Sequence, residues 1–215
     1  NRNSLPYAGI YGMQDDKLET IMRGTFRNKG WSLTVRALIR LGFLTTEEQQ
    51  VAGTSYASIT RALVTAAGGA ADGDLRAATA AALELAADHY VLENMAWLGL
   101  FDEEKKVAAG VDTYLDAVCE AMQANPAMQF AEGERDLVVM RHKYVAHFPA
   151  EDKTEDITTT LVDFGIPNGF SSMARTVSYP VAIATRLLLS GKITTKGVVR
   201  PITAELYNPI LDELE

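Results

Sequence analysis

The middle of the chain carries apolar residues at the spacing of α-helices. From about Trp31 to Gln129 they recur at every third or fourth position, the period of a helix with one buried face. This pattern predicts helices over 33–41, 55–67, 74–87, 90–98 and 112–124. Thr45 and Glu48 form a capping-box pattern, which predicts one more helix start after the first of these.

Stretches on either side of this segment alternate between apolar and polar residues, as β-strands do. Leu18–Asn28 alternates in this way and predicts a half-buried strand. Arg135–Phe148 and Ile157–Phe164 flank a polar turn, so they predict a long antiparallel hairpin. Gly197–Arg200 predicts a brief strand near the end of the chain.

Two helices are expected after the hairpin. The first begins at Ser171 or Ser172, and Pro180 is expected to interrupt or kink it because proline lacks a backbone N–H. The second spans Ala204–Leu214 and is expected to break near Pro209.

The order of strand, helices, strands and helix predicts an α+β fold. We expect a mixed, largely antiparallel sheet domain made of residues 1–30 and 130–215. An all-helical subdomain of residues 31–129 is expected as an insertion into it. Strands from the two ends of the chain would then meet in one sheet.

Composition and charge narrow the function classes. The chain has 215 residues, is 47% apolar and 22% charged, and can therefore bury a core. Its net charge of -8 argues against nucleic acid and anionic membranes as partners. The longest apolar run, Val177–Ser190, is too short to span a membrane. Cys119 is the single cysteine, which excludes an internal disulfide and fits a reducing cytoplasm.

The common catalytic signatures are absent from the sequence. No Gly-x-Gly-x-x-Gly loop follows a predicted strand, and there is no Walker A sequence and no Gly-x-Ser-x-Gly elbow. His89, His142 and His147 do not form a convincing metal triad, since the last two point to opposite faces of one predicted strand. We therefore expect no catalytic residue and no metal site in this chain.

A cationic strand face and a glycine-containing loop are the two candidate binding features. Arg23, Thr25 and Arg27 project to one side of the first predicted strand, and guanidinium groups bind carboxylates through paired hydrogen bonds. The face could bind a small anion or form salt bridges with nearby carboxylates. Gly165–Met173 could likewise receive an anion at a helix amide end, or simply connect a strand to a helix.

Segments spread over nearly the whole chain resemble the rear part of the saccharopine dehydrogenase (glutamate-forming) family of lysine metabolism. In chain order they are Asn1–Ser4, Arg23–Gly30, Trp97–Phe101, Gly133–Met140, Ser171–Val177, Tyr179–Ala184 and Tyr207–Leu211. No single segment is diagnostic, but together, in family order, they are highly specific.

The resemblance implies an oxidoreductase that interconverts saccharopine with glutamate and 2-aminoadipate 6-semialdehyde. The family's enzymes carry an N-terminal Rossmann domain for NAD or NADP, a mixed-sheet substrate and dimerisation domain, and an inserted helical domain. This chain resembles the second and third, so we expect the Rossmann domain to be absent from it and no cofactor to bind to it alone. The chain begins at Asn1 without methionine, which favours a processed or truncated fragment. The resemblance also implies a homodimer.

The family's substrate-binding residues match a few positions of this sequence. Its substrate-binding arginine matches Arg2, and its Thr-Leu-Arg segment matches Thr25, Phe26 and Arg27. Saccharopine bears three carboxylates, so the resemblance favours a carboxylate-binding role for Thr25 and Arg27. The matching Arg23 is expected to be structural.

Two departures from the family pattern leave the substrate open. Asn3 replaces the usual Asp, and Asn28 replaces a common aromatic residue. A carboxynorspermidine- or homospermidine-type polyamine enzyme is one alternative, and a non-catalytic binding or dimerisation module is another. The sequence also leaves open the choice of NAD or NADP, and whether the parent protein is fused to a lysine–ketoglutarate reductase.

Overall fold

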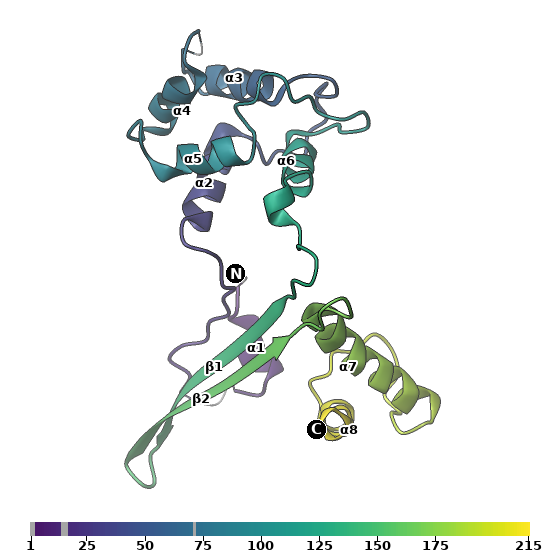
Figure 1. Ribbon diagram of the computed structural model, residues 1–215. Helices are drawn as coiled ribbons and strands as arrows, with labels where there is room; N and C mark the ends of the chain where they lie inside the picture. The colour runs from purple at the N-terminus through teal and green to yellow at the C-terminus, as the bar shows by residue number, and fades with distance from the viewer. Residues whose placement is uncertain (1–2, 14–16, 71) are drawn as a thin grey trace. The chain divides into compact units, whose positions relative to one another are not determined.

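The computed structural model describes residues 3–13, 17–70 and 72–215, so Arg2 lies outside the described residues (Figure 1). The chain divides into two compact units: Thr25–Gln129, here the helical unit, and Asn1–Gly24 with Phe130–Glu215, here the hairpin unit. The elements are α1 (Pro6–Ile10), α2 (Trp31–Leu41), α3 (Tyr56–Ala66), α4 (Leu75–Leu83), α5 (Tyr90–Trp97), α6 (Tyr114–Gln123), η1 (Pro126–Met128), β1 (Leu137–Phe148), β2 (Lys153–Phe164), α7 (Ser172–Leu189) and α8 (Ala204–Leu214). The predicted α+β class is confirmed.

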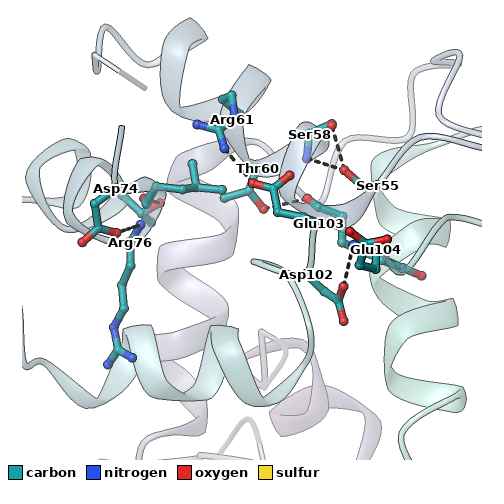
Figure 2. Close-up of polar contacts among 12 residues, drawn as sticks. Ser55, Ser58, Thr60, Arg61, Asp74, Arg76, Asp102, Glu103 and Glu104 are labelled. Carbon is teal, nitrogen blue, oxygen red and sulfur yellow. Dashed lines mark hydrogen bonds and ion pairs between the residues drawn. The ribbon is translucent and has the colours of Figure 1, made fainter. Parts of the chain in front are cut away.

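The helical unit packs α2 to α6 around one apolar core. Fully or nearly fully buried members include Leu38, Leu41, Phe43, Tyr56, Val64, Val91, Met95 and Leu100. A side chain caps the start of α3: the Ser55 hydroxyl accepts a hydrogen bond from the backbone N–H of Ser58 at 3.2 Å (Figure 2). The hydroxyl of Thr60 donates to the carbonyl of Leu100, which ties α3 to the loop after α5.

The hairpin unit is built on one antiparallel strand pair, with Leu137 opposite Phe164 at its open end. This confirms the predicted hairpin. Met140, Tyr144 and Leu161 on its strands keep 48%, 52% and 43% of their surface exposed. A separate small core joins the two terminal helices, where Leu187, Ile193, Leu206 and Ile210 are buried together.

The predicted strand over Leu18–Asn28 is wrong. The described part of this stretch has no regular secondary structure, and Met22 and Phe26 are 82% and 71% exposed. A strand needs hydrogen bonds from a neighbour, and within the described residues only β1 and β2 pair in a sheet. The predicted strand at Gly197–Arg200 is wrong for the same reason, and Val198 there is fully exposed.

The helix predicted to start at Thr45 and Glu48 does not form, because long-range contacts use its backbone. The amide of Gln49 donates to the carbonyl of Asp112 at 2.6 Å, and the carbonyl of Thr45 accepts from the amide of Leu115 at 3.4 Å. These bonds replace the ones that a helix would have made within the segment.

The two C-terminal helices continue through Pro180 and Pro209, so the predicted interruption at Pro180 and break near Pro209 are wrong. Each proline removes one helix hydrogen bond. In α7 both ends are anchored, since Ser172 and Leu187 are both buried. In α8, Leu206 and Ile210 are buried on the two sides of the proline. Packing on both sides of each proline therefore keeps the helix continuous although one hydrogen bond is missing.

Candidate functional site

The segment that carries Thr25, Phe26 and Arg27 is irregular and exposed, and it leads directly into α2. The carbonyl of Asn28 accepts a hydrogen bond from the amide of Trp31 at 3.1 Å, which closes a turn. Gly30 sits in that turn with a φ of 90°, a left-handed conformation that favours glycine. We call residues 25–29 the cationic segment.

Arg27 presents its side chain at the surface of the cationic segment. Its Nη1 donates to the carbonyl of Phe26 at 2.7 Å. Among the ion pairs of the described residues, none includes Arg27. The guanidinium therefore keeps donors that can meet a carboxylate.

Arg23 has a different environment. Its guanidinium lies over the ring of Tyr7, 4.2 Å from the ring centre, a cation–π contact within the hairpin unit. The strand that would have placed Arg23, Thr25 and Arg27 on one face is not formed. The described structure therefore does not assemble the three-residue face that alternation predicted.

The turn at Gly30 is held by residues that sequence reasoning missed. The carbonyl of Gly30 accepts hydrogen bonds from both the amide and the hydroxyl of Thr34, each at 3.1 Å. The Thr34 hydroxyl in turn accepts from Nδ2 of Asn94 on α5, at 2.8 Å. A Cβ on Gly30 would lie 2.9 Å from the Tyr90 ring. We call these four residues, Gly30, Thr34, Tyr90 and Asn94, the Gly30 contact cluster.

Only part of the Gly30 contact cluster could be predicted from the sequence. Thr34 lies four residues after Gly30, the distance at which a helical hydroxyl can reach back to a carbonyl. Asn94 is 60 positions from Thr34, and no local pattern relates the two.

At the second candidate, Gly165–Met173, a carboxylate of the protein itself occupies the helix amide end. Asp136 accepts from the backbone amides of Ser172 and Met173 at 2.6 and 2.8 Å. A Cβ on Gly165 would collide with the Asp136 carboxylate, so this position needs glycine. The loop therefore connects a strand to a helix, and the carboxylate of Asp136 occupies the position at the helix amide end where an anion could have bound.

A second carboxylate strengthens the same connection. Asp163 accepts from the hydroxyl of Ser172 at 2.6 Å and from Arg175 at 2.5 Å. The hydrogen bond from Ser172 and then the one from Arg175 hold the pKa of Asp163 below its ordinary value. The amides of Met173 and Ser172 likewise lower the pKa of Asp136, against a smaller opposing effect of burial.

Metal ligands, membrane-spanning helices and surface depressions are further features of the described residues that bear on function. No three His, Cys, Asp or Glu side chains in the described part of the chain are grouped to hold a metal ion. No helix among the described residues is long and apolar enough to cross a membrane. An open depression of about 600 Å³ on α3 is lined by Ser58, Arg61, Ala62, Thr65 and Ala66. Arg61 there is paired with Glu103 at 2.8 Å (Figure 2).

Comparison with known proteins gives one consistent family. The model of the family described as saccharopine dehydrogenase C-terminal domain matches residues 1–215. The saccharopine dehydrogenase (NADP(+), L-glutamate-forming) of Saccharomyces cerevisiae is 36% identical, over 100% of this chain and 48% of the relative. The mitochondrial alpha-aminoadipic semialdehyde synthase of Bos taurus is 31% identical, over 100% of this chain and 23% of the relative.

The solved structures agree. The apo histidine-tagged saccharopine dehydrogenase (L-Glu forming) of Saccharomyces cerevisiae matches with a TM-score of 0.77 and 33% identity. The match covers 100% of this chain and 47% of that structure. The chain thus spans about half the length of the yeast relative.

Proposed function

Because this chain belongs to the saccharopine dehydrogenase C-terminal domain family, we propose that it supplies the substrate-binding part of an oxidoreductase of lysine metabolism. The reaction interconverts saccharopine with glutamate and 2-aminoadipate 6-semialdehyde, using NAD or NADP. One observation carries the proposal: relatives named as saccharopine dehydrogenases match the chain along its full length.

The nicotinamide cofactor does not fit the residues of this chain. Only β2 leads through a glycine-containing loop into a helix among the described elements, and that loop lacks the Gly-x-Gly-x-x-Gly spacing. The amides that begin α7 are bound to the carboxylate of Asp136, which would repel a pyrophosphate. We therefore assign cofactor binding and hydride transfer to other parts of the full-length protein.

The proposed role of this chain is to bind carboxylates of the substrate. Arg27 is the principal candidate, because its exposed guanidinium has no ion pair among the described residues. Thr25 and Phe26 adjoin it on the cationic segment, and Arg2 is proposed as a further carboxylate ligand on the resemblance alone. Bidentate pairing with Arg27 would add both affinity and orientation.

Arg27→Ala in the full-length protein tests this role. Loss of a charge-assisted hydrogen bond, about 1.5–3 kcal/mol, is expected to raise the KM for saccharopine about 10- to 100-fold. Arg76→Ala is the matched control, because Arg76 lies on α4 and binds Asp74 through its backbone amide, which the substitution keeps. Equal KM values for wild type and Arg27→Ala would contradict the assignment.

A substrate comparison tests the reaction itself. The wild-type full-length protein is expected to turn over saccharopine in a steady-state assay with NAD or NADP. Turnover of carboxynorspermidine with none of saccharopine would contradict the proposed substrate.

A homodimer is proposed on the resemblance, and the exposed apolar side chains of β1 and β2 support it. Analytical ultracentrifugation of the full-length protein tests it, since a monomeric mass at micromolar concentration would contradict it. A cytoplasmic location stays a prediction from the sequence, because the relatives include proteins named as mitochondrial.

A further inference from the structure

The cationic segment has no helix or strand of its own, so the point where it joins α2 contributes to its conformation. That junction is Gly30, the residue directly before α2. An exposed, irregular segment loses conformational freedom when it binds a ligand, and any prior restraint lowers this cost. The contacts at Gly30 can therefore influence the conformation from which Arg27 binds a ligand.

Two hydrogen bonds fix the direction of the Gly30 carbonyl. The amide and the hydroxyl of Thr34 both donate to it at 3.1 Å. Thr34 is 6% exposed, so water competes little for these bonds. The peptide plane that joins Gly30 to α2 is held by the helix itself.

Residues from α5 complete this arrangement. Asn94 donates from Nδ2 to the Thr34 hydroxyl at 2.8 Å, and this bond leaves the hydroxyl proton directed at Gly30. Tyr90 lies four residues earlier, on the same face of α5, and its ring covers the Cα of Gly30. The Tyr90 ring is itself stacked on His89, with centroids 4.6 Å apart. One face of α5 thus packs against Gly30 and Thr34.

We propose that Thr34 and Asn94 are positioning residues for the substrate: through Gly30 they hold the cationic segment in the conformation from which Arg27 binds a carboxylate. The inference rests on the proposed function of Arg27. Neither residue touches the substrate in this scheme. Their effect is to restrain the backbone three positions after Arg27, so that less freedom is lost on binding.

Thr34→Val in the full-length protein is the central test. The substitution keeps the size of the side chain and removes its hydroxyl, and with it the bonds to Gly30 and Asn94. The KM for saccharopine is expected to rise about fivefold with kcat within twofold of wild type. Thr34→Ser, which retains the hydroxyl, is expected to restore the wild-type KM.

A matched control separates positioning from a general loss of stability. Thr79 is fully buried on α4, and its hydroxyl donates to the carbonyl of Leu75 four residues earlier, as that of Thr34 does to Gly30. Thr79→Val removes a comparable bond far along the chain from the junction. It is expected to lower the melting temperature to a similar extent without raising the KM.

Hydrogen exchange gives a readout independent of activity. The backbone amides of Trp31 and Thr34 donate to the carbonyls of Asn28 and Gly30. In Thr34→Val and in Asn94→Ala these two amides are expected to exchange faster than in wild type, whereas Thr79→Val leaves them unchanged. Asn94→Ala also serves as the second variant if Thr34→Val fails to fold. Equal KM values and equal exchange for Thr34→Val, Asn94→Ala and Thr79→Val would overturn the positioning role.

The outcome also distinguishes this inference from the proposed function. If Arg27→Ala raises the KM but the Thr34 and Asn94 variants behave as Thr79→Val does, the binding role stands and the positioning role is wrong. If Arg27→Ala leaves the KM unchanged, the binding role is wrong, and the positioning role fails with it.

Discussion

The two units of the chain are stabilised in different ways. The helical unit buries an apolar core shared by α2 to α6, with side chains such as Phe43, Val64 and Met95 at 1%, 0% and 0% exposure. The hairpin unit buries only a small cluster between α7 and α8, and attaches α7 to the hairpin through Asp136 and Asp163. Apolar burial is nondirectional, whereas such attachments depend on charge and geometry.

The two units also differ in the apolar surface that they leave exposed. The apolar side chains of β1 and β2 are largely exposed, and large exposed apolar patches mark surfaces that other protein surfaces cover. The core of the helical unit is buried by the helices of that unit. The cationic segment belongs to the helical unit, which gives it a rigid base.

The largest expected effect comes from truncating the core of the helical unit. Phe43→Ala removes a 1% exposed ring from a packed site and is expected to lower the unfolding free energy of the unit by about 3–5 kcal/mol. Both tryptophans of the chain, Trp31 and Trp97, lie in this unit, so their fluorescence during urea unfolding measures the change.

Phe170→Ala is the matched control in the hairpin unit, where the ring is 73% exposed. Urea unfolding followed by far-UV circular dichroism, which reports on both units, is expected to show a change in unfolding free energy of less than about 0.5 kcal/mol. Comparable losses for Phe43→Ala and Phe170→Ala would break the distinction between the two units.

A smaller effect is expected from Gly30→Ala at the base of the cationic segment. Its left-handed φ of 90° costs an L-residue about 1–2 kcal/mol, and the added Cβ would also push against Tyr90 at 2.9 Å. Gly53→Ala isolates the contact with Tyr90, because Gly53 has a φ of 77° and nothing within 4 Å of the added Cβ. Urea unfolding that shows equal losses for both variants would mean that Tyr90 does not restrain Gly30.

The smallest effect is an acid-dependent loosening of the hairpin unit. Hydrogen bonds from Thr195 and Thr194 lower the pKa of Glu205 to about 2, and the pKa values of Asp136 and Asp163 are also lowered. A depressed folded pKa adds stability that is complete above the ordinary carboxyl pKa of about 4 and is lost as the pH falls through the folded value.

NMR amide signals measure this loosening. Those of Ser172 and Met173 on α7 and Thr194 before α8 are expected to shift as the pH falls from about 4 towards about 2. Core amides of the helical unit, such as that of Leu92, are expected to keep their positions. Signals of Ser172, Met173 and Thr194 that stay constant to pH 2 would contradict the dependence of the hairpin unit on these carboxylates.

Local patterns predicted the helices well because their determinants lie close together in sequence. The helix predicted over 33–41 ends where α2 ends, and those predicted over 55–67 and 90–98 end within one residue of the ends of α3 and α5. The predicted α4 was too long, because Glu84 adopts a φ of 57° and ends the helix there. No residue of the alanine-rich stretch predicts the left-handed conformation at Glu84.

Within the candidate site, the sequence alone identified Thr25 and Arg27 as cationic-face residues, and the family resemblance added Arg2 and Phe26. Their substrate role stays a prediction. The strand expected to carry them did not form, since alternation shows that a segment can be a strand but does not supply a neighbour to pair with. Thr34 and Asn94 were not predicted at all.

By itself, the sequence determined the α+β class, the hairpin, most helix boundaries and the family. Each depends on short-range periodicity or on motifs that are read directly along the chain. Only the tertiary structure decided that the cationic segment is irregular, that Asp136 occupies the amide end of α7, and that Asn94 meets Thr34 at Gly30. These are contacts between residues far apart along the chain, and packing rather than local propensity determines which of them form.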